Sequence, residues 1–321
     1  MIAPTCHIKI GEIVVQIFCE NEPIFECLRE SLFLESEEKF KKTESDFSLI
    51  IRNGSSTSRE KFFFLKSYPW DSKDTFYFKS ETELMFAKGE DLDVVGILNY
   101  PQKNGEIFIF KEEPTFENAR IVCFTLLKEA GKIFGFFPFH AAALEKNGKV
   151  VLIPAPGGTG KTALTLQLLE DSFSFISDDT VFLHAPHGKR LSVIGFPGKP
   201  KVDSGHLALF PHLKTLSENM EDPAGRWYID LNQNPDDWMK QEGSIDLIIF
   251  LVRGRSFFCR AAPEEALKRL ILGLILPDSN PKFFQSYFYH ILTLADSRNS
   301  YFLGNDSLKA LSFKIENLLK E

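Results

Sequence analysis

The residues of this chain best suited to chemistry form a glycine-rich turn, A-P-G-G-T-G-K-T, at positions 155–162. Gly157, Gly158 and Gly160 lack a Cβ, so their backbone can adopt positive φ and bring N–H groups close to an anion. A helix that begins near Lys161 adds unpaired N–H donors and the positive end of its dipole. This combination predicts a phosphate-binding loop of the Walker A type.

Two side chains at the end of the turn extend this prediction to a nucleoside triphosphate and a metal ion. Lys161 can reach the β- and γ-phosphates, and the Thr162 hydroxyl can complete the shell of a Mg²⁺ ion. Ala155 replaces the first glycine of the G-x-x-x-x-G-K-[ST] pattern, which alanine tolerates where φ is negative. The alternative is a glycine-rich turn without a chemical role. The predicted nucleotide-binding residues are Pro156, Gly157, Gly158, Thr159, Gly160, Lys161, Thr162 and Ala163.

The elements around the turn are those that such a loop requires. The apolar run K-V-V-L-I at 149–153 indicates a buried strand before it, and T-A-L-T-L-Q-L-L at 162–169 indicates a helix after it. Asn147 and Gly148 separate this strand from another apolar segment, which predicts a β-hairpin. Strand, loop and helix therefore agree with the motif.

A second signal is the acidic pair Asp178 and Asp179, which follows the apolar strand F-S-F-I-S at 173–177. Lys161 precedes Asp178 by 178 − 161 = 17 residues, room for about three helical turns, a reversal and one strand. The pair can therefore return beside the loop, where one carboxylate binds metal and the other accepts a proton. The alternative is a turn or helix cap.

His140 is the third candidate, in P-F-H-A-A-A-L on the strand just ahead of the hairpin turn. Its partner strand in the hairpin leads directly into the phosphate loop, which favours a place near the γ-phosphate. The alternative is a structural histidine. Five cations are further candidates for stabilising the transferred phosphoryl group, with surface charge as the alternative for each of them: Lys199, Lys201, Arg226, Arg253 and Arg260.

Composition limits the function classes. The 321 residues carry a net charge of −7, which argues against nonspecific nucleic-acid binding, a property of basic surfaces. No apolar stretch is long enough for a transmembrane helix, and the N-terminus lacks a secretory pattern, so a cytoplasmic protein without membrane attachment is expected. Five cysteines without C-x-x-C spacing are read as reduced thiols, and not as a zinc site or disulfide framework.

The first part of the chain differs in pattern from the second. Short apolar runs at 7–18, 47–51, 75–86, 93–99 and 106–110 indicate strands, and helices are expected at 23–34 and 117–134. Strands and helices alternate from residue 139 onward, with strands at 173–184, 244–252 and 301–304 and helices at 263–276, 281–295 and from 307. Two domains are predicted, a strand-rich α+β domain at 1–134 and a catalytic α/β domain at 135–321.

The second domain resembles the HPr kinase/phosphorylase-like family, whose catalytic fold is shared with phosphoenolpyruvate carboxykinase. The resemblance rests on His140, the A-P-G-G-T-G-K-T loop, the S-D-D strand, G-F-P-G-K-P-K-V-D at 195–203 and the I-I-F-L-V strand followed by P-E-E-A-L-K-R-L. It covers about residues 137–318. The R-G-L-G-I-type segment of HPr kinases has no counterpart here, so HPr itself is not the expected substrate.

The resemblance implies a role for each matching residue. Lys161 and the loop amides would hold the phosphates, Thr162 and Asp179 the metal, and Asp178 would act as the base. His140 would assist at the γ-phosphoryl group, and Arg226 is the first choice among the cations because distant relatives often carry a basic residue there.

The function implied is that of a P-loop serine kinase in a mixed α/β fold. It would use ATP and Mg²⁺ to phosphorylate a hydroxyl, most simply a serine of a protein or peptide recruited by residues 1–134. No nucleic-acid or membrane partner is expected, and homo-oligomer formation is left open. Two alternatives remain: a nucleotide-binding regulatory module without kinase activity, and a small-molecule kinase.

Overall fold

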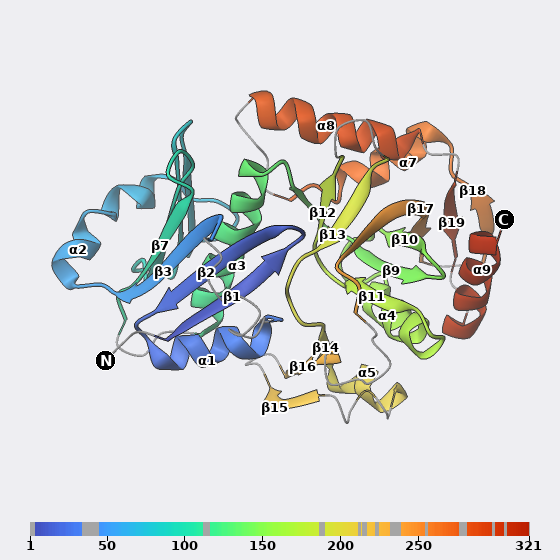
Figure 1. Ribbon diagram of the computed structural model, residues 1–321, viewed down its shortest axis with the longest axis horizontal. Helices are drawn as coiled ribbons and strands as arrows, with labels where there is room; N and C mark the ends of the chain where they lie inside the picture. The colour runs from blue at the N-terminus through green and yellow to red at the C-terminus, as the bar shows by residue number, and fades with distance from the viewer. Residues whose placement is uncertain are drawn as a thin grey trace. The chain divides into compact units, whose positions relative to one another are not determined.

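The computed structural model of the chain describes residues 4–33, 45–111, 116–185, 190–210, 213, 217–221, 225–231, 239–253, 256–275, 281–296, 299–304 and 307–320. The chain divides into two compact units, Met1–Gly135 and Phe136–Glu321. Each combines a mixed β-sheet with helices, so the molecule belongs to the α/β class (Figure 1). Within the described residues, no helix combines the length and apolar character needed to cross a bilayer.

The first unit contains a seven-stranded sheet in the order β1-β2-β3-β7-β6-β5-β4. The β2–β3 and β3–β7 pairs are parallel, and the other neighbours are antiparallel. Its strands are β1 (Thr5–Ile10), β2 (Ile13–Cys19), β3 (Phe47–Asn53), β4 (Thr75–Lys79), β5 (Glu83–Lys88), β6 (Val94–Asn99) and β7 (Asn104–Ile109). Its helices are α1 (Glu22–Ser31), α2 (Ser56–Glu60), the 3₁₀ helix η2 (Phe63–Ser67) and α3 (Phe116–Ile133).

Alternation along β6 sends successive side chains to opposite faces of this sheet. Val95 and Ile97 join a hydrophobic cluster with Leu65 of η2. Gly96 faces α3 so closely that a Cβ there would lie 2.6 Å from Val122 Cγ1. The helix α3 therefore covers one face, and the short helical segment covers the other.

The second unit contains a nine-stranded sheet whose main path is β11-β9-β10-β17-β13-β12-β8, with β19 and β18 attached beside β17. Its strands are β8 (Phe137–Phe139), β9 (Ala142–Lys146), β10 (Lys149–Ile153), β11 (Ser174–Ser177), β12 (Val181–His184), β13 (Ser192–Gly195), β17 (Glu242–Leu251), β18 (Phe258–Arg260) and β19 (Ser300–Leu303). A small antiparallel sheet, β14-β16-β15, lies apart from that path. It contains β14 (Lys201–Asp203), β15 (Ser217–Glu221) and β16 (Arg226–Ile229), and α5 (Ser204–Leu209) follows β14.

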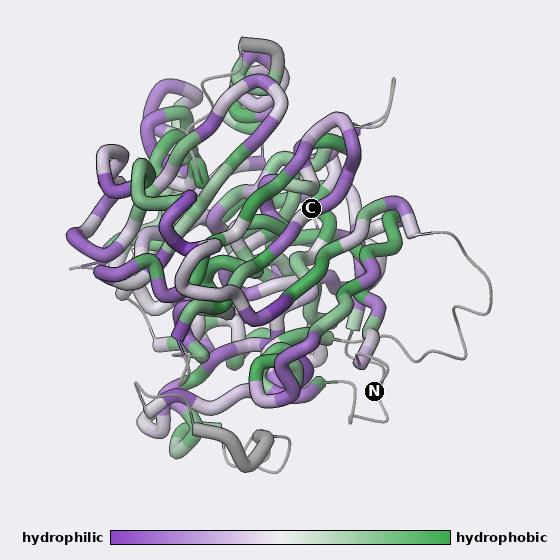
Figure 2. The backbone as a smooth tube through the Cα atoms, turned by 90° about the vertical axis from the view of Figure 1, so that its left-hand side faces the viewer, coloured by the Kyte–Doolittle hydropathy of each residue, from purple (hydrophilic) through white to green (hydrophobic). Residues whose placement is uncertain are grey.

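Helices cover both faces of the nine-stranded sheet (Figure 1). Val150 and Leu152 of β10 pack into a cluster with Leu270 and Ile291, which belong to α7 (Pro263–Ile271) and α8 (Pro281–Ala295). On the other side, α4 (Lys161–Glu170) contacts β9 and α9 (Leu308–Lys320). Figure 2 shows hydrophobic and hydrophilic stretches alternating along the backbone tube. The sheet is therefore the middle layer of an α/β/α arrangement.

Several elements differ from the sequence prediction. The run at 7–18 is two strands, because the chain reverses at Gly11 with a φ of 58°. The helix predicted to reach residue 276 ends at Ile271, since Gly273 and Leu274 pack against β8. A Cβ on Gly273 would lie 2.6 Å from the Phe139 ring, so this close approach needs glycine. The helices α2 and η2 were not predicted, because they are too short for a periodic pattern.

Candidate functional site

Strand pairing brings the phosphate loop, the acidic pair and His140 to one edge of the nine-stranded sheet, whereas Arg226 lies in the small sheet. β9 is antiparallel to both β10 and β11, so those two strands run in the same direction. Ile153 at the end of β10 lies opposite Ala142, and Ser177 at the end of β11 lies opposite Ala143. The phosphate loop, the acidic pair and the segment that precedes β9 therefore meet at this edge.

In the loop between β10 and α4, two of the three glycines have the positive φ that the sequence suggested, and Gly157 does not. Gly158 and Gly160 adopt φ of 74° and 95°, in the left-handed region that side chains disfavour. Gly160 is the N-cap of α4 and offers no capping side chain, so the first-turn N–H groups have no side-chain cap. Ala155 is buried and lies outside the positive-φ positions, which is why alanine is tolerated there. The Thr159 hydroxyl braces the loop by donating to Pro156 O at 2.8 Å.

Lys161 begins α4 and is almost completely buried, with 7% of its surface exposed. Burial lowers the pKa of its ammonium group, while the nearby carboxylates of Asp179 and Asp178 act in the opposite direction. Its Nζ lies 3.1 Å from His140 Nε2. A cation in this position is available to an anionic ligand at the helix N-terminus.

His140 lies between β8 and β9, and not on a strand as the sequence predicted. The backbone N–H of His140 donates to Gly273 O at 2.7 Å, which fixes the His140 backbone beside the end of α7. Its Nδ1 lies 3.3 Å from Asp179 Oδ1. The Lys161 ammonium can only donate, so the geometry fits a neutral imidazole that accepts at Nε2 and donates from Nδ1–H to the carboxylate. His140 thereby links Lys161 to Asp179.

Asp178 is the buried member of the acidic pair, with 8% of its surface exposed. Its Oδ2 accepts a hydrogen bond of 3.2 Å from Thr162 Oγ1. Its Oδ1 is also buried and has no hydrogen-bond partner in the described part of the chain. Burial raises the pKa of this carboxyl, against the opposing effects of Lys161 and of the Thr165 and Thr162 hydroxyls. Thr165 lies near the carboxylate but outside hydrogen-bonding geometry.

Asp179 is the exposed member, and 73% of its side-chain surface is accessible. Thr180 Oγ1 donates to its Oδ2 at 3.2 Å, and Ser177 Oγ donates to Thr180 O at 2.6 Å. Hydrogen bonds from the Ser177 and Thr180 hydroxyls therefore stabilise the S-D-D-T turn. Sequence reasoning did not single out Thr180, although a hydroxyl residue beside an acidic turn is a common local signal.

The donor set at Asp178 fits a hard divalent cation. Mg²⁺ prefers oxygen ligands and is usually held by one or two protein side chains together with substrate phosphates and water. The unpartnered Asp178 Oδ1 and the adjacent Thr162 hydroxyl supply such oxygens. Among the described residues there is no group of three or more His, Cys, Asp or Glu side chains able to hold a metal by themselves. Thr162 with Asp178 is therefore the best-fitting metal site, whereas the sequence analysis paired Thr162 with Asp179.

The five candidate cations occupy different surroundings. Lys199 forms a buried ion pair of 3.3 Å with Asp230, and Lys201 lies over the Tyr228 ring at 5.3 Å. Arg226 begins β16 of the small sheet, opposite Asp203, and Arg260 ends β18. Arg253 follows β17 and lies beside Gly158 of the loop. The sequence signal for Arg253 is its place directly after the I-I-F-L-V strand.

The raised pKa of Asp178 predicts a measurable stability effect. A carboxyl whose folded-state pKa is raised binds its proton more tightly when folded, so ionisation destabilises the fold as pH rises through that pKa. Asp178→Asn is therefore expected to be more stable than wild type at about pH 8. The difference should shrink as the pH falls and vanish only below the unfolded pKa of 3.8, where the Asp178 carboxyl is protonated in both the folded and the unfolded state. Urea unfolding at several pH values measures this difference.

The matched control for this measurement is Asp179→Asn. Because Asp179 is mostly exposed, its replacement should change the free energy of unfolding by no more than about 0.5 kcal/mol. An Asp178→Asn protein that is less stable than wild type across the whole pH range would contradict the prediction.

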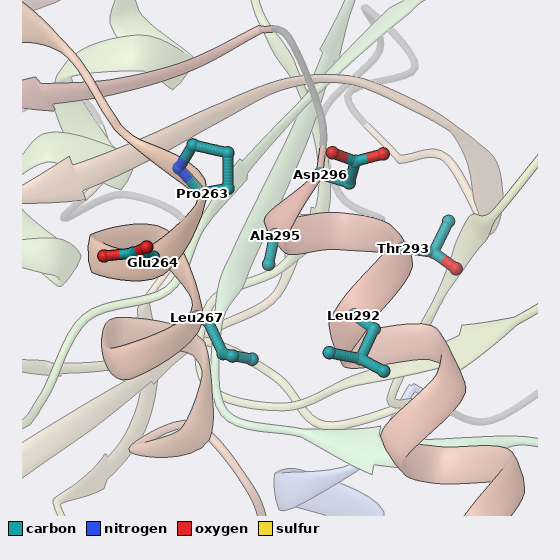
Figure 3. Close-up of a pocket in the computed structure, with 7 residues that line it drawn as sticks. All are labelled: Pro263, Glu264, Leu267, Leu292, Thr293, Ala295 and Asp296. Atoms are coloured by element: carbon teal, nitrogen blue, oxygen red, sulfur yellow. The ribbon is translucent and has the colours of Figure 1, made fainter.

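A separate cavity of about 510 Å³ lies between α7 and α8. Figure 3 shows Leu267 of α7 and Leu292 of α8 facing one another across it. Among its described lining residues the charged ones are Glu264 and Asp296, which would repel phosphate. The cavity is therefore unsuited to a nucleotide, and the phosphate loop remains the candidate site.

Comparisons with known proteins identify no family for this chain. No protein-family model matches it, and no curated protein sequence matches it. Among solved structures it is similar to the Hpr(Ser) kinase/phosphatase from Coxiella burnetii at 16% identity, over 57% of this chain and 88% of that one, with a TM-score of 0.33. A TM-score this low supports no argument about function, which must come from the site itself.

Proposed function

We propose that this protein is a kinase that uses ATP and Mg²⁺ to transfer the γ-phosphoryl group to a hydroxyl. The observation that carries the proposal is that a glycine-rich loop, a hydroxyl–carboxylate pair and a histidine lie together at one sheet edge. Thr162 donates a hydrogen bond to Asp178, and His140 contacts both Lys161 and Asp179. Phosphoryl transfer requires a phosphate cradle, a metal ligand and a proton acceptor, and this edge offers residues for all three.

The two carboxylates are suited to different tasks. Asp178 is buried beside the Thr162 hydroxyl, and a bound divalent cation would offset the cost of ionising it there. We assign Asp178 and Thr162 to the metal ion, which would supply positive charge to neutralise the negative charge that develops on the phosphates. Asp179 is exposed enough to meet an incoming acceptor and is oriented by His140 and Thr180. This division reverses the one that the family resemblance implied.

In the proposed reaction, Asp179 accepts the proton of the acceptor hydroxyl while the hydroxyl oxygen forms a bond to the γ-phosphorus. The bond between that phosphorus and the β,γ-bridging oxygen breaks, and ADP leaves. Lys161 and the loop N–H groups hold the phosphates throughout. His140 keeps the Asp179 carboxylate in place through its Nδ1–H and fixes Lys161 through Nε2.

The acceptor class is proposed to be a serine of a protein or peptide, recruited by the first unit. The test incubates the full chain with γ-labelled ATP, Mg²⁺ and a library of serine-, threonine- and tyrosine-containing peptides. Transfer of label to serine peptides supports the proposal. Label released only as inorganic phosphate would favour a regulatory ATPase, and label on added sugars or alcohols would favour a small-molecule kinase. If residues 135–321 alone phosphorylate peptides as well as the full chain does, the first unit is not the recruiting part.

A further inference from the structure

The end of β17 lies level with the phosphate loop. β17 runs parallel to β10, with Val151 opposite Leu247 and Leu152 opposite Ile248. β10 ends at Ile153, but β17 continues to Leu251. The chain after β17 therefore emerges at the same sheet edge where β10 gives way to the loop.

Arg253 follows β17 by two residues and approaches the middle of the loop. A Cβ built on Gly158 would lie 3.3 Å from Arg253 Nη2. Gly158 has a φ of 74° and no side chain, so the guanidinium faces bare loop backbone. The loop amides are the groups that cradle a phosphate chain, and a cation beside them can share that anion.

The Arg253 side chain is exposed and makes no hydrogen bond or ion pair with any residue of the described ranges. Its backbone is held in place, because Val252 N donates to Leu303 O at 3.0 Å and Leu251 pairs with Leu303 of β19. Lys199, by contrast, already forms an ion pair with Asp230. The Arg253 backbone is thus held in place, while its guanidinium has no hydrogen-bond or ion-pair partner among the described residues.

We propose that Arg253 is a second cationic ligand of the nucleotide, binding its polyphosphate chain beside Gly158. Arginine stays charged at all relevant pH values and offers paired N–H donors that match phosphate oxygens. Lys161 approaches the phosphates from the start of α4, and Arg253 approaches them from the end of a different strand. This proposal rests on the nucleotide binding in the proposed function, but it does not require phosphoryl transfer.

The test measures the dissociation constants of ATP with Mg²⁺ for wild type, Arg253→Ala and Arg253→Lys. Arg253→Ala is expected to bind ATP about tenfold to about a hundredfold more weakly, the loss typical of a charge-assisted contact. Arg253→Lys should recover part of that loss. AMP has no polyphosphate chain, so Arg253→Ala and wild type should bind it alike. Unchanged ATP affinity in Arg253→Ala, or an equal loss for AMP, overturns the proposal.

Arg190→Ala is the matched control. Arg190 is exposed and pairs with Asp246, whose other oxygen accepts from Val150 N at the opposite end of β10. Arg190→Ala should leave ATP affinity unchanged. If it weakens ATP binding as much as Arg253→Ala does, the Arg253 effect reflects the loss of surface charge in general. The outcome is independent of catalysis. If wild type binds ATP but transfers no phosphate, the proposed kinase activity is wrong. If wild type transfers phosphate and Arg253→Ala binds ATP as tightly as wild type, only the proposed role of Arg253 is wrong.

Discussion

Lys161→Ala is expected to bind ATP with Mg²⁺ about tenfold to about a hundredfold more weakly than wild type and to lose measurable phosphoryl transfer. The ammonium group is buried at the start of α4, beside His140, where the first-turn N–H groups have no side-chain cap. A charge-assisted contact of about 1.5–3 kcal/mol is lost with it. Isothermal titration calorimetry measures the binding, and transfer of the γ-label measures turnover.

The fold should survive this substitution, because burial already disfavours the charged form of Lys161 and lowers its pKa. Circular dichroism and thermal unfolding check this. Lys268→Ala is the control for removing a lysine, since Lys268 is exposed on α7 and forms an ion pair with its neighbour on the helix, Glu265. If Lys161→Ala binds ATP as tightly as wild type, the loop is not the nucleotide site.

The acidic pair should separate turnover from metal dependence. Asp179→Asn keeps the shape of the turn but removes the proposed proton acceptor, so turnover should fall about 10²- to 10⁴-fold with little change in ATP affinity. Asp178→Asn should instead raise the Mg²⁺ concentration needed for half-maximal activity, because one of two proposed oxygen ligands loses its charge. Steady-state kinetics at varied Mg²⁺ concentration distinguish the two variants.

Two other results would change the roles proposed for Asp178 and Asp179. The reverse pattern, with Asp178→Asn losing turnover at saturating Mg²⁺, would support the division that the family resemblance implied. Mild and identical effects from both variants would remove the acidic pair from the chemistry. Thr162→Ala provides an internal check, because it should share the metal phenotype of Asp178→Asn and not the phenotype of Asp179→Asn.

The sequence determined those parts of the molecule whose signals lie between near neighbours. The Asn147-Gly148 turn has both residues at positive φ, 55° and 78°, and the hairpin forms there as predicted. The helix predicted at 281–295 has those bounds in α8, and the strand before the acidic pair ends at Ser177. Backbone preference and hydrophobic periodicity act over a few residues, so local sequence is enough to specify them.

Only the tertiary structure decided which distant segments share a sheet edge. The sequence pattern does not predict that β11 pairs with β9. It also does not predict which strand lies beside β10, where the structure has β17. Those pairings bring Asp178 to Thr162 and Arg253 to Gly158, and they place Arg226 in a different sheet. Strand order depends on packing between residues far apart in the chain, and a local pattern cannot encode that choice.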